Sequence, residues 1–116
     1  MGTNVVFMGW DRPIPGREPV ATALFQEFLQ YLGGQQQAGA IQSFEPVFLN
    51  AHGGDLNGFA LIRGESGKLD ALLSSEAWET YMIRANLLMD GFGVLRGVTG
   101  ELLLKQMEAF IRFAPA

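Results

Sequence analysis

Residues 44–63 constrain the fold of this chain most, because they combine two strand-like runs with a polar, glycine-rich loop between them. Alternating β-branched and aromatic residues, bounded by Gly, Asn and Asp, are typical of paired strands. The loop also holds His52, the single histidine of the chain, close to Asp55 and Asn57. The stretch therefore predicts a pair of strands and the densest group of reactive side chains in the sequence.

The apolar pattern predicts four strands, at residues 4–10, 41–49, 58–63 and 92–98. Pro46 cannot donate a backbone hydrogen bond, so we expect the strand at 41–49 to lie at a sheet edge. The segment at 11–16, DRPIPG, contains two prolines and is predicted to be a turn that ends the first strand.

Helical spacing of apolar residues predicts helices between and after these strands. The first begins near Pro19 and is expected to end at Gly33 and Gly34, which tolerate the left-handed conformation that closes a helix. The second begins near residue 68 under a Ser66 cap, is interrupted at residues 74–75 and continues to residue 88. A last helix, capped by Thr99, carries apolar residues from 102 to 111.

The order β-α-β-β-α-β with an extra C-terminal helix predicts a ferredoxin-like α+β fold, in which one face of an antiparallel four-stranded sheet carries the helices. The chain has 116 residues, which suits a single domain spanning residues 1–116. The predicted strands are apolar on both faces, whereas a sheet with one wet face should alternate apolar and polar residues. We therefore expect a second copy of the chain to cover the open face, giving a homodimer.

Composition narrows the classes of partner. Eight Lys and Arg against twelve Asp and Glu give a net charge of −4, without the basic run that nucleic-acid binding requires. The chain has no cysteine, which excludes disulfides and thiolate chemistry. It shows neither a signal-peptide pattern nor an apolar run of about 18 residues that could span a membrane. A soluble cytoplasmic protein is the expectation.

The chain resembles the dimeric α+β barrel superfamily over residues 44–98, and within it the YCII-related domains and small uncharacterised proteins. The resemblance is carried by HGGDLNGFALIRGES (52–66), KLDALLSSEAW (68–78) and FGVLRGV (92–98). It implies two ferredoxin-like subunits packed sheet to sheet. The superfamily includes cofactor-independent monooxygenases of the antibiotic-biosynthesis type, muconolactone-isomerase-like enzymes and heme-binding branches.

In YCII-like domains the implied active pair is an aspartate and a histidine near the first strand and helix. Here that connection reads GWDRPIPGRE (9–18) and contains no histidine. The role is therefore not carried over to His52. A lone loop histidine is also weak support for a heme ligand.

His52 and Asp55 are the first catalytic candidates, since an imidazole is a capable base near neutral pH and a carboxylate can orient it. Asn57 lies beside them as a candidate substrate contact. The alternative is that this polar loop only shapes the turns and leaves His52 solvated. The pair is too small for a zinc site, which needs at least three protein ligands, so we expect no metal.

Three charged residues in predicted strands, Glu45, Arg63 and Arg96, are candidates for substrate binding. If their sides of the sheet coincide, they form an interior cluster that could grip a carboxylate. The alternative is a structural ion pair or a dimer contact.

Further substrate-binding candidates come from the end of the first strand and from the second helical region. Trp10 could form an apolar wall and Arg12 an anion contact at the strand end. Tyr81 carries a hydroxyl that could reach a pocket, although helix packing is the commoner role of such an aromatic residue.

Together these features predict a small-molecule-binding protein that needs no cofactor. Its pocket is expected between sheet and helices, or between the two sheets of a dimer, lined by Phe and Met residues with a few polar groups. Its chemistry would be proton transfer or oxygenation of an aromatic or carboxylated metabolite. The alternative is a non-catalytic dimeric interaction module. The sequence leaves open whether the protein is an enzyme.

Overall fold

Four strands form an antiparallel sheet in the order β3-β4-β1-β6. They are β1 (Val5–Trp10), β3 (Ser43–Phe48), β4 (Gly58–Arg63) and β6 (Gly93–Gly97). The structure is a computed structural model and describes residues 2–115. The predicted ferredoxin-like order is confirmed, and β3, which contains Pro46, lies at an edge as expected.

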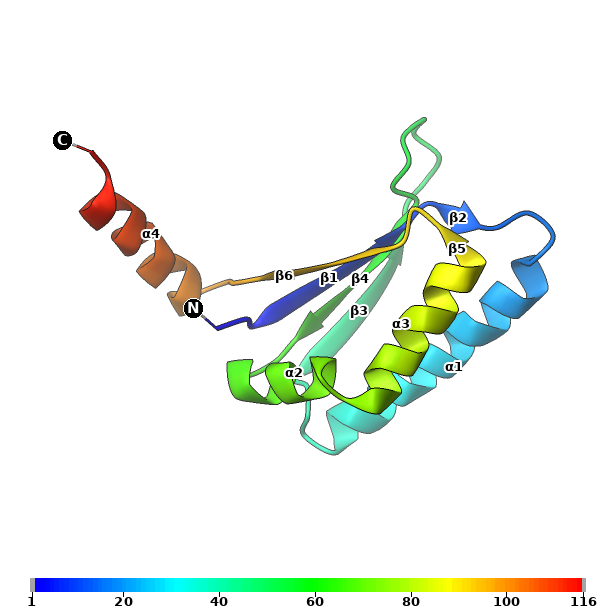
Figure 1. Cartoon of the computed structure of the whole chain (residues 1–116), viewed down its shortest axis with the longest axis horizontal. Coiled ribbons are helices and arrows are strands. Elements are labelled where there is room, and N and C mark those ends of the chain that lie inside the picture. Colours follow the sequence, from blue (N-terminus) through cyan, green and yellow to red (C-terminus); the bar gives the residue numbers. More distant parts are fainter. Residues whose placement is uncertain (1, 116) are drawn as a thin grey trace.

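Three helices cover one face of the sheet (Figure 1). They are α1 (Glu18–Gln37), α2 (Ser66–Leu73) and α3 (Glu76–Leu88). Alternate strand residues such as Val6 and Ile62 are fully buried against Leu32 of α1 and Leu69 of α2. This apolar layer between sheet and helices is the core, and its burial is the main force that stabilises the fold.

The end of α1 differs from the prediction. The helix continues through Gly33 and Gly34 to Gln37, and the chain turns at Gly39, which has φ +80°. Each glycine inside a helix costs up to about 1 kcal/mol relative to alanine. The helix therefore ends three residues beyond Gly34, just before the left-handed turn at Gly39.

Two predicted helix caps are also wrong. Ser66 is the first residue of α2, whose N-cap is Glu65 without a side-chain hydrogen bond. The N-cap of the last helix is Gly100, because Thr99 instead donates its backbone N–H to Oδ1 of Asn4 over 2.8 Å. The predicted interruption at residues 74–75 is confirmed, since Ser75 accepts a hydrogen bond from the backbone N–H of Trp78 at the start of α3.

The predicted turn at residues 11–16 contains a short strand. β2 (Arg12–Pro13) pairs antiparallel with β5 (Met89–Asp90) and forms a two-stranded ribbon beyond the end of β1. Pro13 has no backbone N–H to donate. It is tolerated here because both strands of a two-stranded ribbon are edge strands. The ribbon joins the chain entering α1 to the chain leaving α3.

The C-terminal helix α4 (Glu101–Phe113) projects away from the rest of the chain beyond the end of β6 (Figure 1). None of its residues is buried. The radius of gyration is 16.1 Å, whereas a compact domain of this length has about 13 Å. The projecting helix therefore leaves the described chain more extended than a closed domain.

The second face of the sheet, which we call the open face, carries Val5, Phe7, Phe59, Leu61 and Leu95. The rings of Phe7 and Phe59 stack with centroids 5.1 Å apart. These side chains are half-buried or exposed, and no element of residues 2–115 forms a layer over them. The apolar character predicted for both faces is thus present in the sheet.

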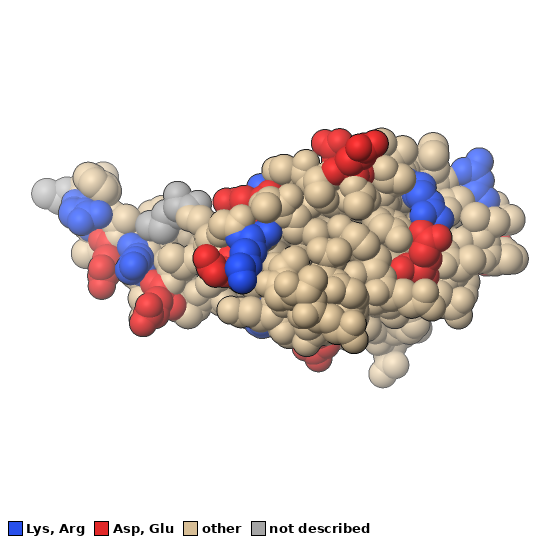
Figure 2. All heavy atoms as spheres, turned by 90° about the horizontal axis from the view of Figure 1, so that it is seen from below, with Lys and Arg blue, Asp and Glu red and all other residues tan. Residues whose placement is uncertain are grey.

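Charged side chains are scattered over the surface. On the face shown in Figure 2, basic and acidic residues lie near one another around broad uncharged areas. None of the helices within residues 2–115 combines the length and the apolar character that a membrane crossing requires.

Candidate functional site

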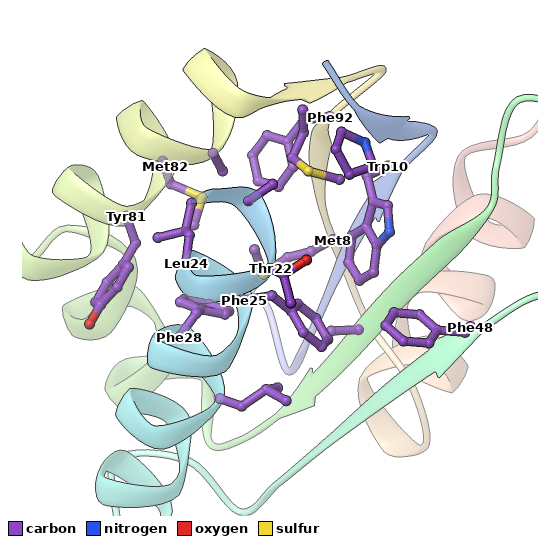
Figure 3. Close-up of a pocket in the computed structure, with 16 residues that line it drawn as sticks. Met8, Trp10, Thr22, Leu24, Phe25, Phe28, Phe48, Tyr81, Met82 and Phe92 are labelled. Carbon is purple, nitrogen blue, oxygen red and sulfur yellow. The ribbon is translucent and has the colours of Figure 1, made fainter. Parts of the chain in front are cut away.

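A cavity of about 180 Å³ lies between the sheet and helices α1 and α3, and it is the candidate site (Figure 3). It is lined by side chains that are almost all apolar: Met8, Trp10, Pro13, Ala21, Thr22, Leu24, Phe25, Phe28, Leu29, Phe48, Ala60, Tyr81, Met82, Ala85, Met89 and Phe92. Concave apolar pockets with few polar groups are the usual form of a small-molecule site.

Three aromatic rings from different elements form one wall of the cavity. Trp10 of β1 and Phe25 of α1 meet edge to face with centroids 5.7 Å apart, and Phe48 of β3 lies 5.4 Å from Phe25. Phe48 is 71% exposed although its strand places it on the helix side of the sheet. A large apolar ring that lines an apolar cavity and is also exposed to water is typical of a ligand-binding groove.

The position of Trp10 depends on the glycine opposite to it. Trp10 and Gly58 are cross-strand partners in the β1–β4 ladder. A Cβ atom placed on Gly58 would lie 2.7 Å from three atoms of the indole, closer than van der Waals contact permits. The glycine therefore lets the indole lie against β4 and line the cavity.

Polar side-chain groups at the cavity are few: the indole N–H of Trp10 and the hydroxyls of Thr22 and Tyr81. The hydroxyl of Thr22 donates to the carbonyl of Glu18 over 2.9 Å. The hydroxyl of Tyr81 points away from Trp10 in Figure 3 and lies with Glu27 and Arg84 on the outer side of the helices. The cavity is therefore suited to an uncharged ligand.

Tyr81 is the titratable residue among those that line the described cavity. Burial, together with the hydrogen bond to Glu27, raises the pKa of its phenol. Arg84 forms an ion pair with Glu27, and the Arg84 guanidinium lies 5.5 Å from the centre of the Tyr81 ring. Hydrogen bonds from Arg84 and then Tyr81 lower the pKa of Glu27. These contacts tie α1 to α3 and keep Tyr81 in its neutral form.

Two of the predicted site residues, Trp10 and Tyr81, line the cavity. Arg12 does not: it lies in the β2–β5 ribbon opposite Asp90, with the charged groups 4.0 Å apart and both side chains largely in water. Trp10 therefore belongs to the cavity wall, whereas Arg12 is not among the residues that line it.

His52 and Asp55 lie in the loop between β3 and β4 and do not line the cavity. Both ring nitrogens of His52 are engaged within this loop. Nε2 lies 2.6 Å from the carbonyl oxygen of Leu56, and Nδ1 accepts from the backbone N–H of Gly54 over 3.2 Å. His52 therefore takes part in the hydrogen bonding of its own loop, rather than being left only to solvent.

Asn57 closes the same loop onto the end of β1. Its backbone N–H donates to the carbonyl of Trp10 over 2.9 Å, and its side-chain amide donates to Oδ1 of Asp11 over 2.6 Å. Asn57 therefore fixes the loop beside the strand that carries Trp10, without lining the cavity itself.

The predicted cluster of Glu45, Arg63 and Arg96 is not assembled within one chain. Arg96 is paired with Val6 and so lies on the helix side, where its guanidinium is 3.9 Å from Asp70 of α2. Glu45 and Arg63 lie on the open face, exposed and on neighbouring strands. The alternation of side chains within one strand does not show which face a neighbouring strand presents. The register between the strands decides this, and it separates Arg96 from Glu45 and Arg63.

The sequence predicted a pocket lined by Phe and Met residues, but it did not show which of them line the cavity. Phe25, Phe48, Met82, Met89 and Phe92 line it, but they carry no reactive group that would attract attention. The available signal was the gathering of aromatic residues and methionine on the core-facing positions of α1 and α3, which core packing explains equally well. Only the arrangement of the layers shows that a space remains between them.

Residues 2–115 contain no group of three or more His, Asp or Glu side chains positioned to hold a metal ion. The cavity lining likewise offers no nitrogen or carboxylate ligand.

Comparison with solved structures supports the fold. The chain is similar to the crystal structure of PA3566 from Pseudomonas aeruginosa, with a TM-score of 0.54 and 17% identity over 86% of this chain and 97% of that one. A second similar structure is a putative antibiotic biosynthesis monooxygenase from Chloroflexus aurantiacus J-10-fl, with a TM-score of 0.47 and 16% identity over 84% and 95% of the two chains. No family model and no curated protein sequence matches the chain. The fold is therefore that of a ferredoxin-like α+β domain.

Proposed function

We propose that this protein binds a small, uncharged, largely aromatic molecule in the cavity between its sheet and helices. The observation that carries the proposal is the cavity itself, which is lined mostly by aromatic, methionine and other apolar side chains. Aromatic rings favour edge-to-face and offset contacts with a flat ligand, and methionine adapts its shape to it.

The lining argues against a carboxylated ligand. A carboxylate placed in the cavity would lose its hydration without meeting a cation, because Arg12, Arg63 and Arg96 all lie elsewhere. Any reaction in this space would also lack a basic side chain, since the raised pKa of Tyr81 makes its phenolate scarcer near neutral pH. Binding is the proposed activity, and oxygenase chemistry that needs no protein base remains compatible with it.

The relationship to YCII-related domains and the catalytic roles of His52 and Asp55 stay predictions. The proposed binding activity depends on neither.

The methionines provide a direct test. Met8, Met82 and Met89 line the cavity, whereas Met107 lies on α4. With methyl-13C methionine, titration with 1-naphthol should shift the three cavity resonances along one saturable curve and leave Met107 unshifted. Uniform shifts of all the methyl groups, or none at saturating 1-naphthol, would refute binding in the cavity.

An interaction module is the second candidate, and the open face favours it. Its half-exposed apolar side chains belong to a sheet that carries helices on one side only (Figure 1). Such faces are usually covered, and two sheets pack about 10 Å apart. We propose that two copies of the chain associate through this face, which is compatible with ligand binding on the opposite side of each sheet.

A further inference from the structure

Helix α4 has an apolar stripe that no part of the described chain covers. Its apolar residues recur at the spacing of one helix face, and each is exposed: Leu103, Leu104, Met107, Phe110 and Ile111. Phe110 is 70% exposed and Ile111 76%. Contiguous apolar surface of this kind marks a site of association.

The opposite face of α4 carries charges of both signs. Glu101 and Lys105, and then Glu108 and Arg112, are spaced four residues apart with the acidic residue first, the order that supports a helix. An isolated helix of 13 residues is marginal in water, so α4 needs packing against another surface to be stable.

We propose that α4 is an exchanged arm, whose apolar stripe packs against the open face of a second copy of this chain. The proposal rests on the association of two copies through the open face proposed above, and it adds the element that completes the cover. Each copy would supply one uncovered helix and one uncovered sheet face. In a dimer with two-fold symmetry, the helix of each copy would cover the sheet face of the other.

The connection between β6 and α4 supports this assignment. Leu95 of β6 lies on the open face, and α4 begins only a few residues beyond the end of that strand. Gly100 holds φ +63°, a left-handed conformation that sets the direction of the helix away from its own sheet (Figure 1). The arm therefore starts at the border of the surface that needs covering and extends outward.

The charges on α4 disfavour a membrane as the occupant. Helices that lie on anionic bilayers carry Lys and Arg on their polar face. The polar face of α4 has two acidic and two basic residues, and the chain as a whole has a net charge of −4. Both signs are visible at the projecting end in Figure 2. The polar face of α4 has two charges of each sign and therefore brings no net charge to the surface of a second copy.

The natural absence of cysteine permits a clean test by cross-linking. Two full-length chains of different tag size are prepared, one with Met107→Cys and one with Leu95→Cys. After mixing and mild oxidation, we expect a disulfide-linked heterodimer, because the helix of one copy meets the sheet of the other. The matched control is Glu108→Cys, on the polar face of α4, which should give at least tenfold less heterodimer with Leu95→Cys.

A second measurement separates the arm from the sheet contact. Leu104→Glu with Ile111→Glu should raise the dimer dissociation constant at least tenfold by analytical ultracentrifugation, while far-ultraviolet circular dichroism shows the sheet and core helices retained. The arm is refuted if this variant and the wild type dimerise equally, although the association through the open face then stands.

A monomeric wild type refutes both the exchanged arm and the association through the open face, while the 1-naphthol titration still tests the cavity. Self-linking of Met107→Cys without linking to Leu95→Cys, or sedimentation with anionic vesicles through α4, also refutes the arm.

Discussion

The indole ring of Trp10 lies in the space that a side chain at Gly58 would occupy, and the two residues face each other across the β1–β4 ladder. The contact places the indole in the wall of the cavity, and it requires glycine at position 58 of β4.

Substitution of Gly58 by alanine should therefore displace Trp10. We expect the free energy of unfolding to fall by about 1–3 kcal/mol, the usual cost of overpacking, and the tryptophan emission to shift. Gly33→Ala is the control, because a Cβ there meets nothing within 4 Å and the residue lies inside α1. That variant should gain up to about 1 kcal/mol in urea denaturation. Equal stability of Gly58→Ala and the wild type would contradict the packing described.

The cavity volume itself can be tested from α1. Ala21 is buried and lines the cavity, whereas Ala23 lies on the exposed side of the same helix. Ala21→Leu should weaken binding of 1-naphthol at least tenfold, about 1.4 kcal/mol, by filling the space. Ala23→Leu should bind within twofold of the wild type. Loss of binding in both variants would point to a general change in the helix.

How much the sequence could predict depends on whether a feature is local. The order of strands and helices follows from the spacing of apolar residues. Pro46 correctly marked an edge strand, because a residue without an N–H cannot complete the hydrogen bonds of a central strand. The end of α1 could not be read from Gly33 and Gly34, since neither adopts a positive φ and the chain turns only at Gly39. Local patterns predicted elements, and packing set their limits.

The candidate site shows the same division. Trp10 and Tyr81 were found because strand ends and helix stripes are visible in the sequence. Arg63 and Arg96 were expected together, but strand register puts them on opposite faces of the sheet. His52 drew attention as the single histidine, although its two ring nitrogens are used by the loop. Reactive residue types indicate chemistry only when their neighbours in space are known.

The Asn57–Asp11 hydrogen bond makes a prediction about the loop between β3 and β4. Asn57→Ala removes a part-buried bond of 2.6 Å, and we expect a loss of about 1 kcal/mol in the free energy of unfolding. Amide exchange at residues 50–57 should accelerate more than exchange in the sheet. Asn50→Ala, at an exposed position of the same loop, is the matched control. Unchanged exchange in Asn57→Ala would show that the loop is held by other contacts.

The ion pair between Glu27 and Arg84 predicts a pH dependence of stability. Hydrogen bonds from Arg84 and Tyr81 lower the pKa of Glu27 in the folded state, so its contribution is present above the pKa of the unfolded chain and is lost as the pH falls through the folded value. The stability difference between the wild type and Glu27→Gln should therefore shrink as the pH falls from about 6 to about 3. Urea denaturation at several pH values measures it. Glu79→Gln, an exposed carboxylate of α3, controls for the loss of one negative charge, and a constant difference for Glu27→Gln would contradict the lowered pKa.

Association through the open face can be separated from general surface hydrophobicity by two lysine substitutions. Leu95 on the open face and Ile83 on α3 are similarly exposed, 66% and 62%, so neither substitution should disturb the folded chain. Leu95→Lys would bury a charge without a partner in the apolar interface proposed on the open face, which costs several kcal/mol and should convert a dimer into monomer at micromolar concentration. Ile83→Lys should leave the dimer intact, because α3 lies on the other side of the sheet from the open face (Figure 1). Sedimentation velocity of both variants decides the matter: dissociation by Ile83→Lys in place of Leu95→Lys would move the interface to the helical side of the sheet.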